Sequence, residues 1–154
     1  MPKSSLPSWP SEGEEAGQND WETAREAETN KEEAAAAAAL SALRLLYGEE
    51  ARPRSEAQLS LCVAAIRREK NIIAVLPTGS GKSAAWLVPA LCDPGCMTLV
   101  VVPFKALLDQ HLADAQGRGI RAEKWTAKLY NKFPEEVNLL FAACESIGSP
   151  AFKS

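Results

Sequence analysis

The chain contains short apolar runs in which hydrophobic residues follow one another without alternating polar positions. Residues 71–76 (NIIAVL), 97–102 (MTLVVV) and 137–143 (VNLLFAA) are the clearest of these runs. A strand that faces water on one side alternates, so an unbroken apolar run predicts a strand buried on both faces, as in parallel sheets. We therefore predict strands in these three runs and a weaker strand at residues 120–125.

Other segments repeat their apolar residues at helical spacing. Leu40, Leu43 and Tyr47 share one helix face, and Gly48 follows as a helix stop. Ser55 is placed to cap the next helix. Because helices and strands take turns along the chain, the pattern predicts an α/β fold with a parallel sheet. The predicted helices cover about residues 31–47, 56–70, 82–91 and 105–116.

The start of the chain differs in composition from the rest. Residues 1–40 hold nine acidic and three basic residues, whereas the remainder of the 154 residues has a balance of +3. The first part is poor in aliphatic residues and cannot bury enough surface to offset the entropy of ordering it. We therefore predict a disordered acidic arm, 1–33, before a folded domain, 34–154. The domain's charge suits phosphate-rich ligands but does not by itself indicate nucleic-acid binding.

The cysteines and the hydropathy argue against several protein classes. The four cysteines form no C-x-x-C pair and the chain has one histidine, so a zinc site is not expected. No apolar run approaches the roughly 20 residues of a membrane span, and no secretory leader opens the chain. These patterns favour an intracellular protein with reduced thiols, nuclear if the source is eukaryotic.

The segment LPTGSGKS, residues 76–83, carries the clearest chemistry. It lies between a predicted strand and a predicted helix, where backbone N–H groups and the helix dipole attract a phosphate. Its lysine would reach the β- and γ-phosphates of ATP or GTP, and its last hydroxyl would bind Mg²⁺. A tight turn without a ligand is the alternative, although such a turn has no need of a lysine there. The candidate residues are Thr78, Gly79, Ser80, Gly81, Lys82 and Ser83, with Ser83 also the candidate metal ligand.

The same segment resembles motif I of superfamily 2 helicases of the DEAD/DEAH-box type, which often lack the first glycine of G-x-x-x-x-G-K-S/T. Upstream, Tyr47-Gly48, the stretch RPRS at 52–55 and Gln58 resemble the adenine-binding motif of the RecQ-like branch. Downstream, residues 101–107 (VVPFKAL) resemble motif Ia, and residues 143–152 resemble the approach to motif Ib.

The resemblance implies a role for several residues outside the loop. Gln58 would hydrogen-bond the adenine edge, while Tyr47 or an arginine, Arg54 or Arg52, would stack on the base. Pro103 and Lys105 would lie against nucleic acid, with the lysine contacting phosphates of single-stranded DNA. Solvent-facing roles remain alternatives for Gln58 and Lys105.

The resemblance also implies a RecA-like P-loop fold with three layers, of which this chain holds the N-terminal part of the first lobe. No D-E-x-H/D tetrad follows the loop, so we expect an incomplete sheet with exposed apolar edges and no ATP hydrolysis or unwinding by this chain alone. The implied function is the ATP-binding portion of a 3′→5′ DNA helicase. A non-catalytic nucleotide-binding remnant and an unrelated P-loop ATPase or GTPase are the alternatives.

Overall fold

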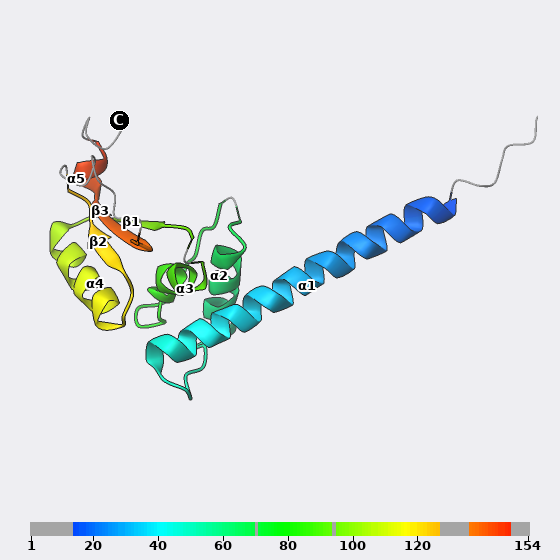
Figure 1. Ribbon diagram of the computed structural model, residues 1–154, viewed down its shortest axis with the longest axis horizontal. Coiled ribbons are helices and arrows are strands. Elements are labelled where there is room, and N and C mark those ends of the chain that lie inside the picture. The colour runs from blue at the N-terminus through cyan, green and yellow to red at the C-terminus, as the bar shows by residue number, and fades with distance from the viewer. Residues whose placement is uncertain (1–13, 70, 94, 127–135, 149–154) are drawn as a thin grey trace, which may run out of the picture.

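A small parallel sheet lies among helices at one end of the computed structural model, which describes residues 14–69, 71–93, 95–126 and 136–148 (Figure 1). Its three strands follow the order β1-β3-β2, and both pairings are parallel. The strands agree with three of the predicted runs, which confirms the α/β class with a parallel sheet. Their bounds are β1 (Thr98–Val102), β2 (Ala122–Lys124) and β3 (Leu139–Ala143).

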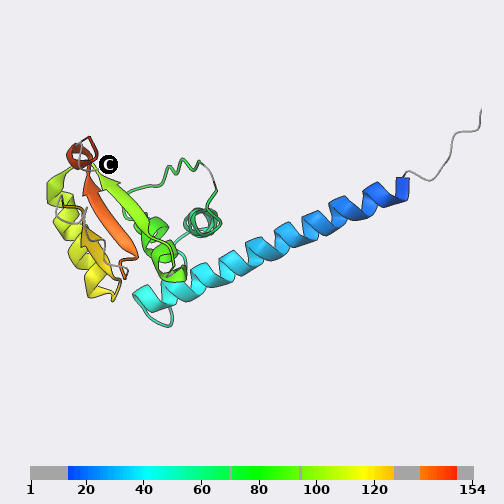
Figure 2. The ribbon, with the colours of Figure 1, turned by 45° about the horizontal axis from the view of Figure 1, so that its top comes forward.

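Helices precede and connect the strands. Ser55 caps one of them as predicted, because its Oγ accepts a hydrogen bond of 3.1 Å from the backbone N–H of Gln58. The helix after the glycine loop and the helix after β1 pack against the sheet (Figure 2). The bounds are α1 (Glu14–Tyr47), α2 (Glu56–Ile66), α3 (Ala84–Cys92), α4 (Lys105–Gly117) and α5 (Cys144–Ile147).

The core lies against one face of the sheet. Val102 of β1 and Phe141 of β3 are almost fully buried there and pack in one cluster with side chains of α1, α3 and α4. On the other face of β1, Leu99 and Val101 remain 43% and 44% exposed. A third layer that would bury these two side chains is therefore not seen in the described part of the chain, in line with the incomplete sheet expected from the sequence.

The prediction of a strand at residues 71–76 is wrong for this structure. The segment forms no ladder with β1, and Ile73 and Val75 are 94% and 92% exposed. An unalternating apolar run needs a neighbouring strand on each side and packing on both faces. The described residues offer this segment neither, so the run extends from α2 to the glycine loop without pairing.

The N-terminal arm also differs from its prediction. Residues 14–33, expected to be disordered, belong to α1, which projects away from the sheet in both views (Figures 1 and 2). This stretch is rich in Glu and Ala, and such residues favour helix even where nothing packs on them. Among the residues whose burial is described, from 20 onward, the first buried one is Ala35, from which the helix joins the core. Residues 1–13 lie outside the described ranges, and the domain division at residue 34 stays a prediction.

The long helix does not have the character of a membrane span. Although α1 contains 34 residues, many of them are charged. Within the described ranges, no helix combines the length and the apolar character that crossing a bilayer requires.

Candidate functional site

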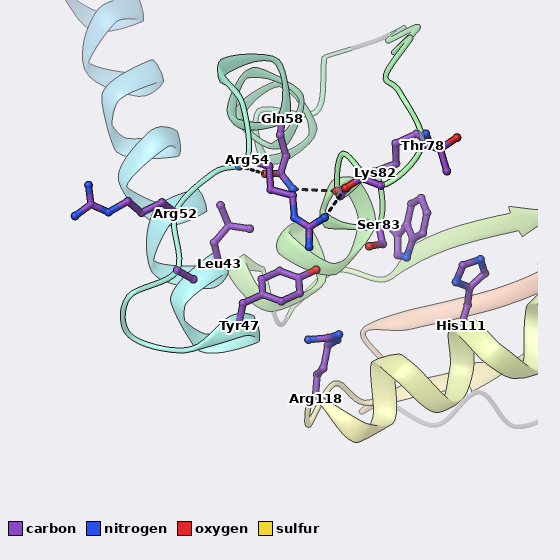
Figure 3. Close-up of a pocket in the computed structure, with 14 residues that line it drawn as sticks. Leu43, Tyr47, Arg52, Arg54, Gln58, Thr78, Lys82, Ser83, His111 and Arg118 are labelled. Atoms are coloured by element: carbon purple, nitrogen blue, oxygen red, sulfur yellow. Dashed lines mark hydrogen bonds between the residues drawn. The ribbon is translucent and has the colours of Figure 1, made fainter.

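A cavity of about 590 Å³ opens where α1, α2, α3 and α4 come together beside the glycine loop (Figure 3). This volume falls within the usual range for a cofactor site. Among the residues that line it are four cations, Arg52, Arg54, Lys82 and Arg118, and no carboxylate. With the exception of Ser80, the predicted nucleotide-contacting residues all line this cavity: Tyr47, Arg54, Gln58, Thr78, Gly79, Gly81, Lys82 and Ser83.

The glycines shape the loop that forms one wall of the cavity. Gly79 and Gly81 both have φ of +79°, in the left-handed region that side chains with a Cβ rarely adopt. The carbonyl of Gly81 then accepts a hydrogen bond of 3.0 Å from the N–H of Ala84, where α3 begins. The two glycines thus turn the chain sharply from an extended segment into a helix, a geometry that a phosphate-binding loop and the alternative of a tight turn without a ligand share.

Gln58 connects the loop before α2 to the glycine loop. Its side chain is 3% exposed, and its Oε1 accepts a hydrogen bond of 2.7 Å from the N–H of Arg54. Its Nε2 donates to the carbonyl of Gly81 at 3.0 Å. A carboxamide has two N–H groups and two acceptor lone pairs, so one of each remains for a ligand. The adenine contact of Gln58 stays a prediction, beside this bridging contact that sequence analysis did not foresee.

The side chains of the loop have few partners. The Nζ of Lys82 donates to the carbonyls of Leu76 and Pro77, at 2.9 and 2.8 Å, and the side chain is exposed. The guanidinium of Arg54 donates to the carbonyl of Gly79. The Oγ of Ser80 is buried without a hydrogen-bond partner in the described part of the chain, which is a costly arrangement for a hydroxyl. The loop therefore brings Lys82, together with Arg54 from the segment before α2, to the wall of the cavity, whereas the hydroxyl of Ser80 stays buried outside the cavity lining.

Sequence analysis assigned no site role to five of the residues that line the cavity, and three of these have aromatic or charged side chains: Trp86, His111 and Arg118. The ring of His111 packs edge-on against Trp86, with centroids 5.7 Å apart, and stacks 6.1 Å from Phe141. His111 lies within α4, and Arg118, seven residues later, directly follows the helix, so the two side chains lie on the same side of it. Trp86 could have been predicted, because it lies one helical turn after Ser83 and therefore on the same side of the helix as the loop. The two residues from α4 had no such signal before the fold was known.

The predicted nucleic-acid residues lie at the other end of α4, outside the cavity. Pro103 is exposed, and Lys105 is the first residue of the helix, with a side chain that is 72% exposed. The Nζ of Lys105 forms an ion pair of 2.8 Å with Glu145, and this hydrogen bond raises the pKa of Lys105 above its usual value. The structure brings Lys105 near an acid and leaves its predicted contact with DNA untested.

Comparison with known families identifies the broader group. The sequence matches the model of the DEAD/DEAH box helicase family over residues 55–146, well over half of the chain. The chain belongs to the DEAD/DEAH box helicase family. The match runs from Ser55, the cap of α2, to Ser146 in α5, and so includes the glycine loop and all three strands. Membership implies a RecA-like P-loop fold, of which the described residues form a part.

Individual relatives point to one branch of the family. The chain is 43% identical over 60 residues to ATP-dependent DNA helicase Q1 of Rattus norvegicus, over 39% of this chain and 10% of that protein. It is 31% identical over 85 residues to ATP-dependent DNA helicase RecQ of Haemophilus influenzae, over 55% of this chain and 13% of that protein. A further match, 34% over 90 residues, is to helicase Q1 of Mus musculus and covers 51% of this chain and 14% of that protein. The chain thus resembles RecQ-type helicases and spans only a small share of their length.

Proposed function

We propose that this chain is the ATP-binding portion of a RecQ-like ATP-dependent DNA helicase. The observation that carries the proposal is the single cavity in which the GSGKS loop meets Tyr47, Arg54 and Gln58, three residues from segments well upstream in the sequence. The curated relatives are described as ATP-dependent DNA helicases, which supports the same assignment. The sequence has no D-E-x-H/D tetrad after the loop, so the proposal for this chain is nucleotide binding and not turnover.

The residues of the loop fit a nucleotide's phosphates. The cavity is lined by four cations and by no carboxylate. Lys82 would bind the terminal phosphates, exchanging its two carbonyl contacts for charged ones. The hydroxyl of Ser83 would hold the Mg²⁺ that accompanies ATP, and this ion would neutralise phosphate charge. Tyr47 and Arg54 would contact the base, and Gln58 would use its free N–H and lone pair on the adenine edge.

Binding of nucleic acid would take place at a different surface. Pro103 and Lys105 are exposed at the start of α4, away from the cavity, and an exposed lysine at a helix end can contact a phosphate of single-stranded DNA. The relatives' names include DNA as the substrate, which favours DNA over RNA as the partner. The proposed arrangement places nucleotide at one end of α4 and nucleic acid at the other.

The direct test is calorimetry with Mg-ATP on the wild type and on Lys82→Ala. We expect binding that weakens at least tenfold in the variant, because a charge-assisted contact to phosphate contributes about 1.5–3 kcal/mol. Lys82 is exposed, so its loss should leave the fold intact. Lys124→Ala is the matched control, since Lys124 is exposed, pairs with Asp109 and lies outside the cavity. Equal affinity of Lys82→Ala and the wild type contradicts the proposal.

A comparison of ATP with GTP tests the role of Gln58 separately from that of the loop. If Gln58 reads the adenine edge, ATP should bind several times more tightly than GTP, whose edge presents a carbonyl where adenine has an amino group. An affinity for GTP equal to that for ATP would remove this role from Gln58 and would leave the proposed phosphate contacts of the loop unaffected.

A further inference from the structure

Arg118 closes the cavity on the side opposite the glycine loop, and no motif in the sequence pointed to it. It follows α4 directly, and its guanidinium lies over the ring of Tyr47, the last residue of α1, with its central carbon 4.6 Å from the ring centroid. Both side chains line the cavity (Figure 3). The distance is within the range of a cation–π contact.

Neighbouring groups hold the guanidinium in this position. Its Nη1 donates to the carbonyl of Leu46 at 2.9 Å, and its Nε and Nη2 donate to Oδ1 of Asp114 at 3.0 and 2.9 Å. Asp114 lies one turn earlier on α4, whereas Leu46 belongs to α1. Arg118 therefore joins the ends of two helices that come from distant parts of the chain.

Tyr47 lies at a helix end that is partly open to solvent. The side chain is 43% exposed, and Gly48, with φ of +104°, follows it directly. A half-exposed side chain at a helix end can adopt several rotamers, and immobilising it on binding costs conformational entropy. A guanidinium that already covers one face of the ring removes most of that freedom before a ligand arrives.

We propose that Arg118 is a positioning residue that holds the ring of Tyr47 as a stacking wall for the base of the nucleotide. This inference rests on the proposed ATP binding. Because one face of the ring is covered by Arg118, a base stacks on the other face. Arg118 then raises the affinity for the base indirectly, by holding Tyr47, whereas Lys82 contacts the phosphates directly. A competing role, in which Arg118 is one more cation that attracts phosphate, predicts a different response to ligands without a base.

The test compares Mg-ATP with Mg-tripolyphosphate, which has the phosphates and no base, by calorimetry on Arg118→Leu and Arg118→Lys. Arg118→Leu should weaken ATP about fivefold and change tripolyphosphate less than twofold, in keeping with a cation–π and ordering contribution of about 1 kcal/mol. Arg118→Lys keeps the charge without the planar group, so it should restore ATP binding only in part. Equal losses for the two ligands in Arg118→Leu, or no loss for ATP, overturn the inference.

A second comparison removes the ring. In a Tyr47→Leu background, Arg118→Leu should cause no further loss of ATP affinity, because the residue it positions is gone. Additive losses contradict a role through Tyr47. Urea unfolding of each variant verifies the fold. If wild type binds neither ligand, the proposed function fails and the inference with it. If ATP binding depends on Lys82 but not on Arg118, the inference alone fails.

Discussion

Gln58 occupies the space that a side chain at position 81 would need. A Cβ built on Gly81 would lie 2.2 Å from the Nε2 of Gln58, far inside any real contact distance. Gln58 cannot move aside freely, because its carboxamide is buried and bonded to both Arg54 and Gly81. Two constraints therefore require glycine at position 81: its φ of +79° and the adjacent side chain of Gln58.

The first prediction is that Gly81→Ala lowers the free energy of unfolding by about 2–4 kcal/mol and weakens Mg-ATP binding. Left-handed φ alone accounts for about 1–2 kcal/mol, and displacing the bonded amide of Gln58 accounts for the rest. Gly79→Ala is the matched control, because it has the same φ of +79° and nothing within 4 Å of the added Cβ. Gly79→Ala should lower the free energy of unfolding only by the about 1–2 kcal/mol that the left-handed φ costs. Urea unfolding measures both variants.

A double-mutant cycle isolates the contact between the two residues. In a Gln58→Ala background the obstructing side chain is gone. The loss in free energy of unfolding caused by Gly81→Ala should then be smaller than in the wild type by at least about 1 kcal/mol. If the cost of Gly81→Ala is the same in both backgrounds, Gln58 does not restrict position 81.

The second prediction concerns alkaline pH. Cys62 is fully buried, and burial, assisted by the nearby Cys92, raises the pKa of its thiol to about 11 from a usual value of 9.0. Between these values the unfolded chain has lost a proton that the folded chain keeps, so stability should fall as pH rises from 9 to 11, by about 1–3 kcal/mol. Urea unfolding at pH 8, 9, 10 and 11 measures the fall. Cys62→Ala should reduce the fall, and Cys144→Ala, at an exposed thiol, should retain it.

The strands show what an apolar pattern can and cannot predict. Residues 97–102 and 137–143 pair with each other in parallel, as their unbroken apolar runs indicated. Residues 71–76 have the same pattern and do not pair. The pattern reports that a segment needs burial on both faces, but whether neighbours are present depends on the rest of the fold. The same limit applies to residues 14–33, where low hydrophobicity predicted disorder although local propensity favours helix.

Cavity-lining positions were predictable where a motif displays them in the sequence. The loop residues apart from Ser80 were named from the glycines and the lysine, and Gln58 from the resemblance, and all of these line the cavity, while their binding roles stay predictions. Arg118 was not named, because its role depends on α4 ending beside α1, a contact between distant segments. Sequence patterns identify groups that follow one another along the chain, whereas a cavity wall built by tertiary contact has no local signal.

The third prediction concerns the uncovered face of β1. Leu99 and Val101 are half-exposed on this face, and an exposed apolar strand at a sheet edge favours self-association. The double variant Leu99→Thr, Val101→Thr should reduce the oligomer fraction in sedimentation velocity with little change in stability. Val100→Thr is the matched control, since Val100 faces the core and a hydroxyl there should cost about 1–2 kcal/mol. Unchanged self-association in the double variant would exclude this face as its cause.

The last prediction concerns the ion pair between Lys105 and Glu145 at the start of α4 and α5. The carboxylate neutralises the charge that we expect to meet a DNA phosphate, and both side chains are exposed. Glu145→Gln should therefore tighten binding of single-stranded DNA two- to fivefold at low salt, and it should steepen the salt dependence of binding by about one counterion. Fluorescence anisotropy with a labelled oligonucleotide, over a range of salt concentrations, measures both effects.

The matched control for this prediction repeats the change without the lysine. In a Lys105→Ala background, Glu145→Gln removes the same negative charge but frees no cation, so its effect on DNA affinity should be much smaller. Lys105→Ala alone should weaken binding to a similar extent for every oligonucleotide sequence, because a phosphate contact carries no base information. If Glu145→Gln tightens binding equally in both backgrounds, the effect comes from the general field of the carboxylate, and Lys105 is not the group that meets the phosphate.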